Sequence, residues 1–157
     1  FEYLLENLKG VKKVSFVTHS LGGLVVREIL RRNLVWNGTT AHKLVMMGTP
    51  NKGAQIAEFL GRLKAYEIII GPSGQDVKPK QKQDELPEPP IPTLIIAGGR
   101  GNDKGFNPLL NGDNDGIVSV DETRLDVEHE FLLIHSIHTI LMDNKEAIKA
   151  TVKFLST

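Results

Sequence analysis

A short apolar run in this sequence gives way at once to a helical pattern, with Ser20 between the two. Residues 11–18 read as a buried strand, and residues 21–30 carry apolar side chains at helical spacing. A serine held at such a sharp strand-to-helix turn projects its hydroxyl out of the sheet, and the first amide groups of the helix point at whatever binds there. A nucleophilic serine needs this arrangement.

The residues around Ser20 approach the G-x-S-x-G pattern, which has a glycine two positions to either side of the serine. Glycine is favoured there because a larger side chain would collide with the neighbouring strand or helix. Gly22 fits the pattern, whereas Thr18 stands where the first glycine is expected. The strand before the serine and the helix after it supply the structural context that the pattern requires.

Length and composition predict one domain over residues 1–157 with an ordinary apolar core. Nineteen basic residues balance nineteen acidic ones, so no net field favours nucleic acid or an anionic membrane. No apolar run approaches the roughly 18 residues of a membrane span, which argues against stable membrane insertion. The chain lacks cysteine and therefore has no disulfide and no cysteine metal site, which leaves the choice between cytoplasm and periplasm open.

Apolar runs and helical patterns alternate along the chain, which predicts an α/β fold with a predominantly parallel sheet and flanking helices. Further strands are expected at residues 43–47, 93–97 and 127–134, helices at 1–8 and 54–64, and a loop at 33–40. The helix after Ser20 should bury Leu21, Leu24, Val25, Ile29 and Leu30 and expose Arg27, Glu28, Arg31 and Arg32. A last helix, beginning at Asp143, should bury Ile148, Val152 and Leu155. Residues 71–92 are rich in proline and charge and read as a flexible crossover or a lid.

Two further residues can complete the chemistry of a serine nucleophile. Such a serine needs a base within hydrogen-bond reach and a carboxylate that holds the base in the right tautomer. In parallel sheets the site residues gather at the carboxyl ends of the strands. Ser20 ends the first strand, Asp115 lies in the loop after the third, and His138 follows the fourth.

Other residues compete for these roles. His19 and His135 are alternative bases, and Asp103, Asp113 and Asp121 are alternative acids. Residues 111–122 nearly fit a calcium-binding loop, with oxygen ligands at positions 1, 3, 5 and 12 and glycine at 6, but a helix breaker precedes them. Gly99-Arg100-Gly101 does not complete a phosphate loop, and no cofactor or metal site is expected.

Four segments resemble the α/β-hydrolase superfamily of bacterial lipases and esterases. They are residues 18–23 (THSLGG), 48–53 (GTPNKG), 115–120 (DGIVSV) and 135–139 (HSIHT), in that order. The resemblance extends over essentially the whole chain and implies a serine hydrolase acting on carboxylic esters. It implies Ser20 as nucleophile, Asp115 as acid and His138 as base, with the Leu21 backbone N–H as one oxyanion donor.

The resemblance also implies what should accompany this chain. Members of the superfamily begin with several strands and a His-Gly loop that supplies a second oxyanion donor, and neither is found before residue 11. The chain therefore reads as a C-terminal portion, with a sheet edge to be covered by an N-terminal segment or a second chain. The expected ligand is a small-molecule or lipid ester. The alternatives are a non-catalytic fragment that serves as a binding or assembly module, and a calcium-binding loop.

Overall fold

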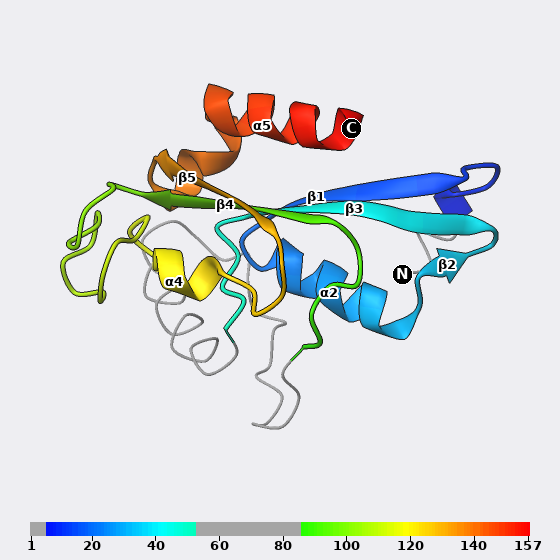
Figure 1. The fold of residues 1–157 in the computed structure, drawn as a ribbon, viewed down its shortest axis with the longest axis horizontal. Helices are drawn as coiled ribbons and strands as arrows, with labels where there is room; N and C mark the ends of the chain where they lie inside the picture. The colour runs from blue at the N-terminus through cyan, green and yellow to red at the C-terminus, as the bar shows by residue number, and fades with distance from the viewer. Residues whose placement is uncertain (1–5, 53–85) are drawn as a thin grey trace.

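The computed structural model describes residues 6–52 and 86–157, which build a mostly parallel sheet between helices (Figure 1). The strands lie in the order β1 (Lys13–His19), β3 (Thr39–Met47), β4 (Thr93–Gly99) and β5 (Glu130–His135). Each of these neighbours pairs in parallel, and β2 (Val35–Trp36) pairs antiparallel with β3. The expected α/β fold with a predominantly parallel sheet is confirmed.

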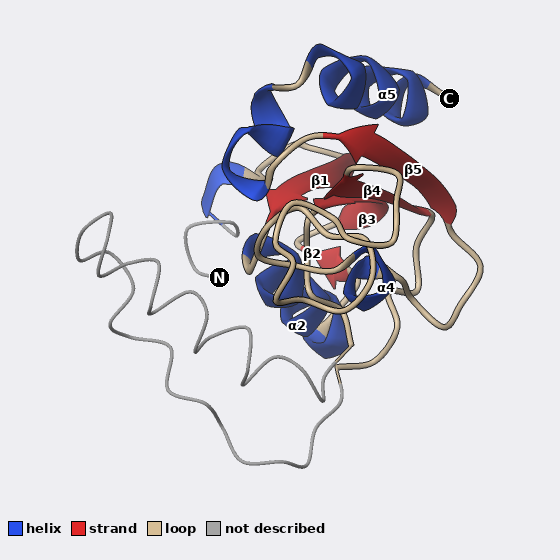
Figure 2. Cartoon of the chain, turned by 90° about the vertical axis from the view of Figure 1, so that its left-hand side faces the viewer, coloured by secondary structure: helices blue, strands red, loops and turns tan. Residues whose placement is uncertain are grey.

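Helices cover both faces of the sheet. Helix α2 (Gly22–Arg32) lies on one face and α5 (Lys145–Ser156) on the other, as Figures 1 and 2 show from two directions. The short helix α4 (Val120–Thr123) and the 3-10 helix η2 (His138–Asp143) follow β4 and β5. Because the strands are parallel, β1, β4 and β5 deliver the segments after them to the same end of the sheet.

The two faces of the sheet bury alternate residues of the same strands. Leu44 and Met46 of β3 pack under α2, whereas Val45 and Met47 pack under α5. This alternation follows from the two-residue period of a strand. All seven residues of β4 are buried, which is typical of a parallel strand covered on both faces and explains the apolar run that follows Thr93.

The segment predicted as a loop at 33–40 contains a β-hairpin, so that prediction was wrong in part. Val35–Trp36 form β2, and Asn37 and Gly38 adopt φ of 50° and 85° before β3 begins. Positive φ at both central residues is the two-residue turn that asparagine-glycine favours, because its twist matches that of the paired strands. The hairpin buries Trp36 against Phe16, with ring centroids 6.1 Å apart.

The buried face of the last helix also differs from the expectation. Its buried residues are Ala147, Thr151 and Phe154, while Ile148 and Val152 are 48% and 59% exposed. The N-cap is Asn144, whose side chain accepts the Glu146 N–H at 2.8 Å, so the helix begins one residue later than predicted. The face of the helix that packs on the sheet is therefore the one that contains Phe154, its one aromatic residue.

Arg27 was expected on the exposed face of α2 but is buried. Its guanidinium donates to the backbone oxygen and the side-chain oxygen of Asn51, each at 3.1 Å, and to the carbonyl of Pro87 at 3.2 Å. Burying an arginine requires such a complete set of acceptors. Val25, expected in the buried stripe, is instead 59% exposed.

Several predictions fall largely on residues that the structure does not describe. The helix at 54–64 lies outside the described residues, as do most of the helix at 1–8 and most of the segment at 71–92. Leu8 is buried and Gly10 has a φ of 78°, as expected where a helix ends. The prediction of one domain over residues 1–157 stays a prediction.

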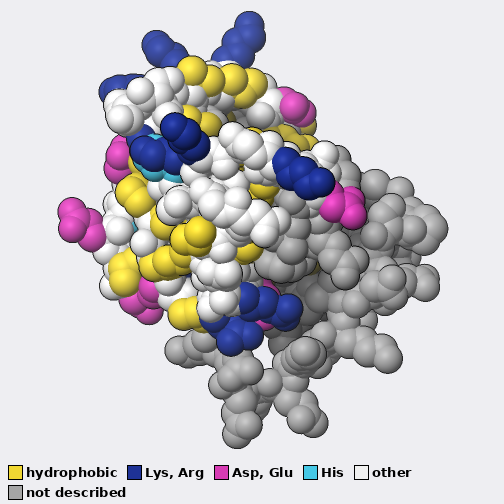
Figure 3. All heavy atoms as spheres, turned by 90° about the vertical axis from the view of Figure 1, so that its right-hand side faces the viewer, with side chains coloured by type: hydrophobic (Ala, Val, Ile, Leu, Met, Phe, Trp, Pro, Cys, Tyr) yellow, Lys and Arg dark blue, Asp and Glu magenta, His cyan; other side chains and the backbone are white. Residues whose placement is uncertain are grey.

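The strands begin at the right-hand side of Figure 1, which Figure 3 views face on. There the basic and apolar side chains of the described residues are interspersed, and neither kind forms one continuous surface. Along the described segments, no helix combines the length and apolarity needed to cross a bilayer.

Candidate active site

Ser20 occupies a strained turn between β1 and α2. Its φ is 55°, a left-handed conformation that is unfavourable for a residue with a side chain. The turn is fixed to β3, because the Ser20 N–H donates to the Met47 carbonyl at 2.8 Å and the Thr49 hydroxyl donates to the Ser20 carbonyl at 2.9 Å. Helix α2 begins two residues later, so the Leu21 N–H lies at the end of the helix where amide groups lack intrahelical acceptors.

The departure of Thr18 from the glycine pattern has a local explanation. Its hydroxyl donates to the Val45 carbonyl at 2.9 Å. A Cβ added at Gly22 would lie 3.7 Å from the Thr18 Cβ, an ordinary van der Waals distance. The close approach falls at Gly23 instead, where an added Cβ would lie less than 3.0 Å from the side chains of Thr49 and Met46. Gly23, rather than position 18, is the glycine that this turn requires.

We expect Gly23→Ala to lower the free energy of unfolding by about 1–3 kcal/mol, the usual cost of overpacking a buried contact. The same change at neighbouring Gly22 should leave stability unchanged or slightly raised, because its Cβ finds space and alanine favours the helix. Urea unfolding of the two variants beside the parent measures the difference. Equal losses in both would contradict the assignment of the close contact to Gly23.

Asp115 is fixed in the loop between β4 and α4 and is 1% exposed. Its Oδ1 accepts the backbone N–H groups of Ile117 at 3.0 Å and Val118 at 2.8 Å. Its Oδ2 lies 2.7 Å from Nδ1 of His138. One carboxylate oxygen therefore holds the loop, and the other is left for the imidazole.

His138 links Asp115 to Ser20. It is the first residue of η2, is 5% exposed, and its backbone N–H donates to the Asp115 carbonyl at 2.9 Å. Its ring Nε2 lies 3.0 Å from Oγ of Ser20. Since a carboxylate only accepts, Nδ1 carries the hydrogen, and Nε2 accepts the hydrogen bond of the Ser20 hydroxyl. The structure thus brings the three predicted side chains into one hydrogen-bonded line.

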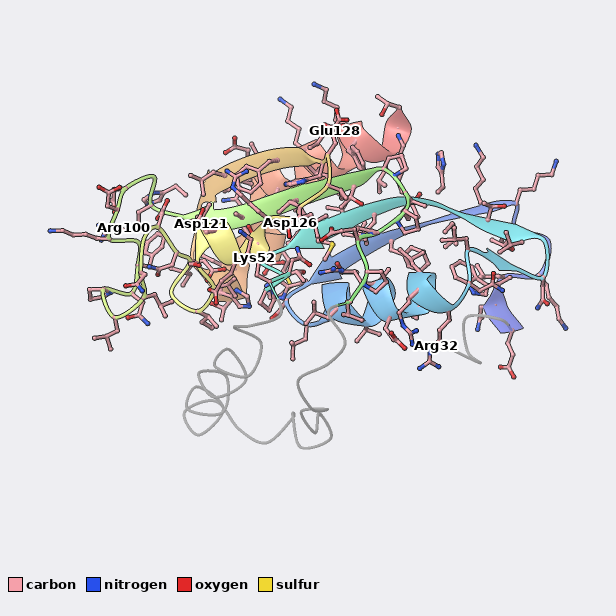
Figure 4. The ribbon with its side chains drawn as sticks, turned by 60° about the horizontal axis from the view of Figure 1, so that its bottom comes forward. Arg32, Lys52, Arg100, Asp121, Asp126 and Glu128 are labelled. Carbon is pink, nitrogen blue, oxygen red and sulfur yellow. The ribbon has the colours of Figure 1, made fainter. Side chains whose placement is uncertain are left out.

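Most of the competing residues lie away from this line. The ring of His135 packs on Phe106, with centroids 5.2 Å apart, and is exposed. Asp103 and Asp121 are exposed, and Asp121 lies on α4 (Figure 4). His19 does reach the site, where it contacts His138.

Three of the four side chains that could ligate calcium in the loop at 111–122 are already hydrogen-bonded. Asp113 accepts two backbone N–H groups from the loop after β4, both at 2.8 Å, and Glu122 accepts the Ser119 N–H at 2.7 Å. Asp115 faces His138. Within residues 6–52 and 86–157, no three His, Asp or Glu side chains gather in a way that could hold a metal ion. The geometry gives the calcium hypothesis no support.

Two residues that shape the site were not singled out by sequence reasoning. Gly48 has a φ of 55°, and a Cβ there would lie 3.1 Å from two ring atoms of His138 and 3.2 Å from Oδ2 of Asp115. Gly98 would place a Cβ 2.8 Å from that of Asp115. Both glycines end buried apolar runs, and Gly48 also opens the esterase-like segment at residues 48–53, but neither signal shows that the glycine lies against the site.

An apolar cavity of about 310 Å³ lies beside the site, between the outer edge of β1 and α5. His19 and Met47 line it at the end nearest Ser20, and the exposed residues Ile148 and Val152 of α5 line its other wall. In the described part of the sheet, β1 pairs with β3 on one side only. The apolar surface that α5 does not bury therefore continues onto the edge of β1 that no described strand covers.

Comparison with solved structures shows the same fold in an esterase. The chain is similar to a carboxylesterase of the thaumarchaeon Nitrososphaera gargenis, with 16% identity and a TM-score of 0.58 over 99% of this chain and 68% of the other. Carboxylesterase CesB (YbfK) from Bacillus subtilis matches with 12% identity and a TM-score of 0.45, over 96% and 62%. Comparison with curated proteins gives no match.

The family comparison concerns the first part of the chain, which includes the Ser20 turn. The family that matches is described as "Putative serine esterase (DUF676)", and its match extends over residues 1–85, more than half of the sequence. This agrees with the resemblance to α/β-hydrolase esterases drawn from the residues. The chain belongs to this serine esterase family.

Proposed function

We propose that this protein hydrolyses carboxylic esters, with Ser20 as nucleophile, His138 as general base and Asp115 as the acid that orients it. The observation that supports the proposal best is the continuous line from Ser20 Oγ to His138 Nε2 at 3.0 Å and from His138 Nδ1 to Asp115 Oδ2 at 2.7 Å. Both distances are those of ordinary hydrogen bonds.

The reaction begins with attack of Ser20 Oγ on the ester carbonyl carbon, while His138 Nε2 takes the hydroxyl proton. The Leu21 N–H then donates to the oxyanion of the tetrahedral intermediate. As the intermediate collapses, His138 returns the proton to the departing alkoxide, and an acyl-enzyme is left on Ser20. Water, deprotonated by His138, then attacks the acyl carbon, the bond to Ser20 Oγ breaks to release the acid, and His138 returns the proton to Ser20 Oγ. Asp115 stabilises the imidazolium that forms in each half.

A series of 4-nitrophenyl esters with increasing acyl length tests this function. We expect the folded protein to release 4-nitrophenolate well above the rate of spontaneous hydrolysis for at least one acyl length. Several acyl lengths are needed because the proposed substrate is either a small-molecule ester or a lipid ester, and the apolar cavity beside the site could hold an acyl chain. A folded protein that accelerates none of them would reject the proposal.

A second candidate function, a non-catalytic binding or assembly module, is favoured by the edge of β1 that no strand of residues 6–52 and 86–157 covers. Val17, Ile148 and Val152 are exposed along this edge and beside the cavity. Exposed strand edges pair readily with another strand, and this one has apolar surface on which such a strand could pack. The occupant that fits is a further β-strand with alternating apolar residues, from an N-terminal segment or a second chain. The two candidates differ in the ester assay, since only the first requires turnover.

A further inference from the structure

The role of His19, the last residue of β1, is not explained by the hydrolytic mechanism. Its Nε2 lies 3.0 Å from the backbone carbonyl oxygen of His138, and the centroids of the two rings are 4.8 Å apart. A carbonyl oxygen only accepts, so the His19 Nε2 carries a hydrogen and donates it. This nitrogen is therefore engaged and is not the base for the neighbouring Ser20.

The surroundings of His19 favour its neutral form. Burial lowers the pKa of His19, and the charge that His138 can carry lowers it further. The hydrogen bond to the His138 carbonyl and the carboxylates of Asp115 and Asp143 act in the opposite direction but do not outweigh them. The lowered pKa favours a neutral His19 ring, with its one ring hydrogen on Nε2. A neutral ring can pack against His138 without repelling the imidazolium that forms there during catalysis.

The backbone of His138 is held on both sides. Its N–H donates to the Asp115 carbonyl at 2.9 Å, and its carbonyl accepts from His19. Asp115 alone would hold the base to the loop after β4. The bond from His19 adds a tie to β1, the strand that ends directly before the nucleophile. Two consecutive residues of one turn, His19 and Ser20, thus contact the backbone and the ring of the same histidine.

We propose that His19 is a positioning residue that holds His138 at the correct distance from Ser20 through the Nε2–H bond to the His138 carbonyl and the contact between the two rings. The inference rests on the proposed ester hydrolysis and extends it to a residue outside the hydrogen-bonded line. His19 exchanges no proton with the substrate. Its contribution is to the geometry of the proton transfer between Ser20 and His138.

Two substitutions separate the hydrogen bond from the ring contact. Glutamine at position 19 keeps an N–H donor at the end of a side chain of similar reach, whereas phenylalanine keeps a ring and loses the donor. We expect His19→Gln to retain kcat within about threefold. His19→Phe should lower kcat about tenfold, the size of one ordinary hydrogen bond, with KM unchanged. Thermal unfolding of both variants controls for loss of fold.

Three kinetic outcomes would overturn the inference. The first is a folded His19→Phe variant whose kcat stays within twofold of the parent. The second is a loss that appears in KM alone, and the third is a His19→Gln variant as impaired as His19→Phe. If His19→Phe does not fold, His19→Gln still decides, because a tenfold loss in that variant would show that the donor does not account for the role of His19.

NMR of the histidine rings gives a readout that does not depend on turnover. We expect the ¹⁵N shifts of His19 to show the Nε2–H tautomer, and the Nδ1 proton of His138 to be seen in the parent and in His19→Gln but to be lost or broadened in His19→Phe. An unchanged His138 signal in His19→Phe would overturn the inference. If the parent hydrolyses no ester, the proposed function fails, and this NMR comparison still decides whether His19 holds His138.

Discussion

Replacing Ser20 with alanine should lower kcat for ester hydrolysis by about 10⁶-fold, the scale on which loss of a serine nucleophile acts. Ser20 Oγ is the atom that forms the acyl-enzyme, and His138 Nε2, at 3.0 Å, is placed to take its proton. Without Oγ, only binding and the oxyanion donor can assist attack by water. The fold should survive, because alanine meets the positive φ of this turn with the same penalty as serine.

Labelling by a fluorophosphonate probe measures the same loss directly. The probe reacts with an activated serine, so intact mass should show one adduct on the parent and none on Ser20→Ala. Ser15→Ala is the matched control, because Ser15 is an exposed serine of the same strand and should leave labelling unchanged. An adduct that persists on Ser20→Ala would place the reactive serine elsewhere, and an unlabelled parent would mean that Ser20 is not activated.

The sequence was sufficient to place the three residues of the candidate site, because each follows a strand. Ser20, Asp115 and His138 come after β1, β4 and β5, and the parallel order of these strands sends the segments after them to one end of the sheet. This reasoning needs only the order of the elements, whereas the choice of Asp115 over Asp113 and of His138 over His135 depended on the local motifs and the resemblance to esterases. Errors of a few residues at the strand boundaries, such as β5 at Glu130–His135 instead of 127–134, do not change it.

Features that depend on contacts across the chain could not be predicted in this way. A helical pattern shows which residues share a face but not how the helix rolls on the sheet, and this is why Ile148 and Val152 were assigned to the core. Arg27 was predicted to be exposed because the sequence does not show that Asn51 and Pro87 supply acceptors for its guanidinium. The Asn37-Gly38 turn is a different case, because asparagine-glycine is a strong local signal for a hairpin. The segment was nevertheless predicted only as a loop.

The contact between His19 and His138 spans 119 residues and leaves no local pattern. Gly23 and Gly48 do lie in two of the segments that resemble esterases, but the sequence does not show which side chains pack against them. A Cβ added at either glycine would come too close to the side chains packed there, which are those of Met46, Thr49 and His138. The sequence therefore predicts the candidate catalytic residues more readily than the residues that hold them in position.

Asp115→Asn should lower kcat about 10⁴-fold while leaving the protein folded, because it reverses the hydrogen-bond polarity at His138. The asparagine Oδ1 can keep the bonds from the Ile117 and Val118 N–H groups, which leaves its NH₂ group facing His138 Nδ1. Since that group donates, Nδ1 must become the acceptor and the ring hydrogen moves to Nε2.

An imidazole with its hydrogen on Nε2 cannot accept the proton of Ser20, so the loss should appear in kcat and in fluorophosphonate labelling, with stability little changed. Asp121→Asn is the matched control, because Asp121 is exposed on α4 and its substitution removes the same charge from the same region (Figure 4). It should keep the activity of the parent. If folded Asp115→Asn stayed within tenfold of the parent, His138 would not need its carboxylate partner. The line from Ser20 to Asp115 would then be a packing arrangement rather than a path for the proton.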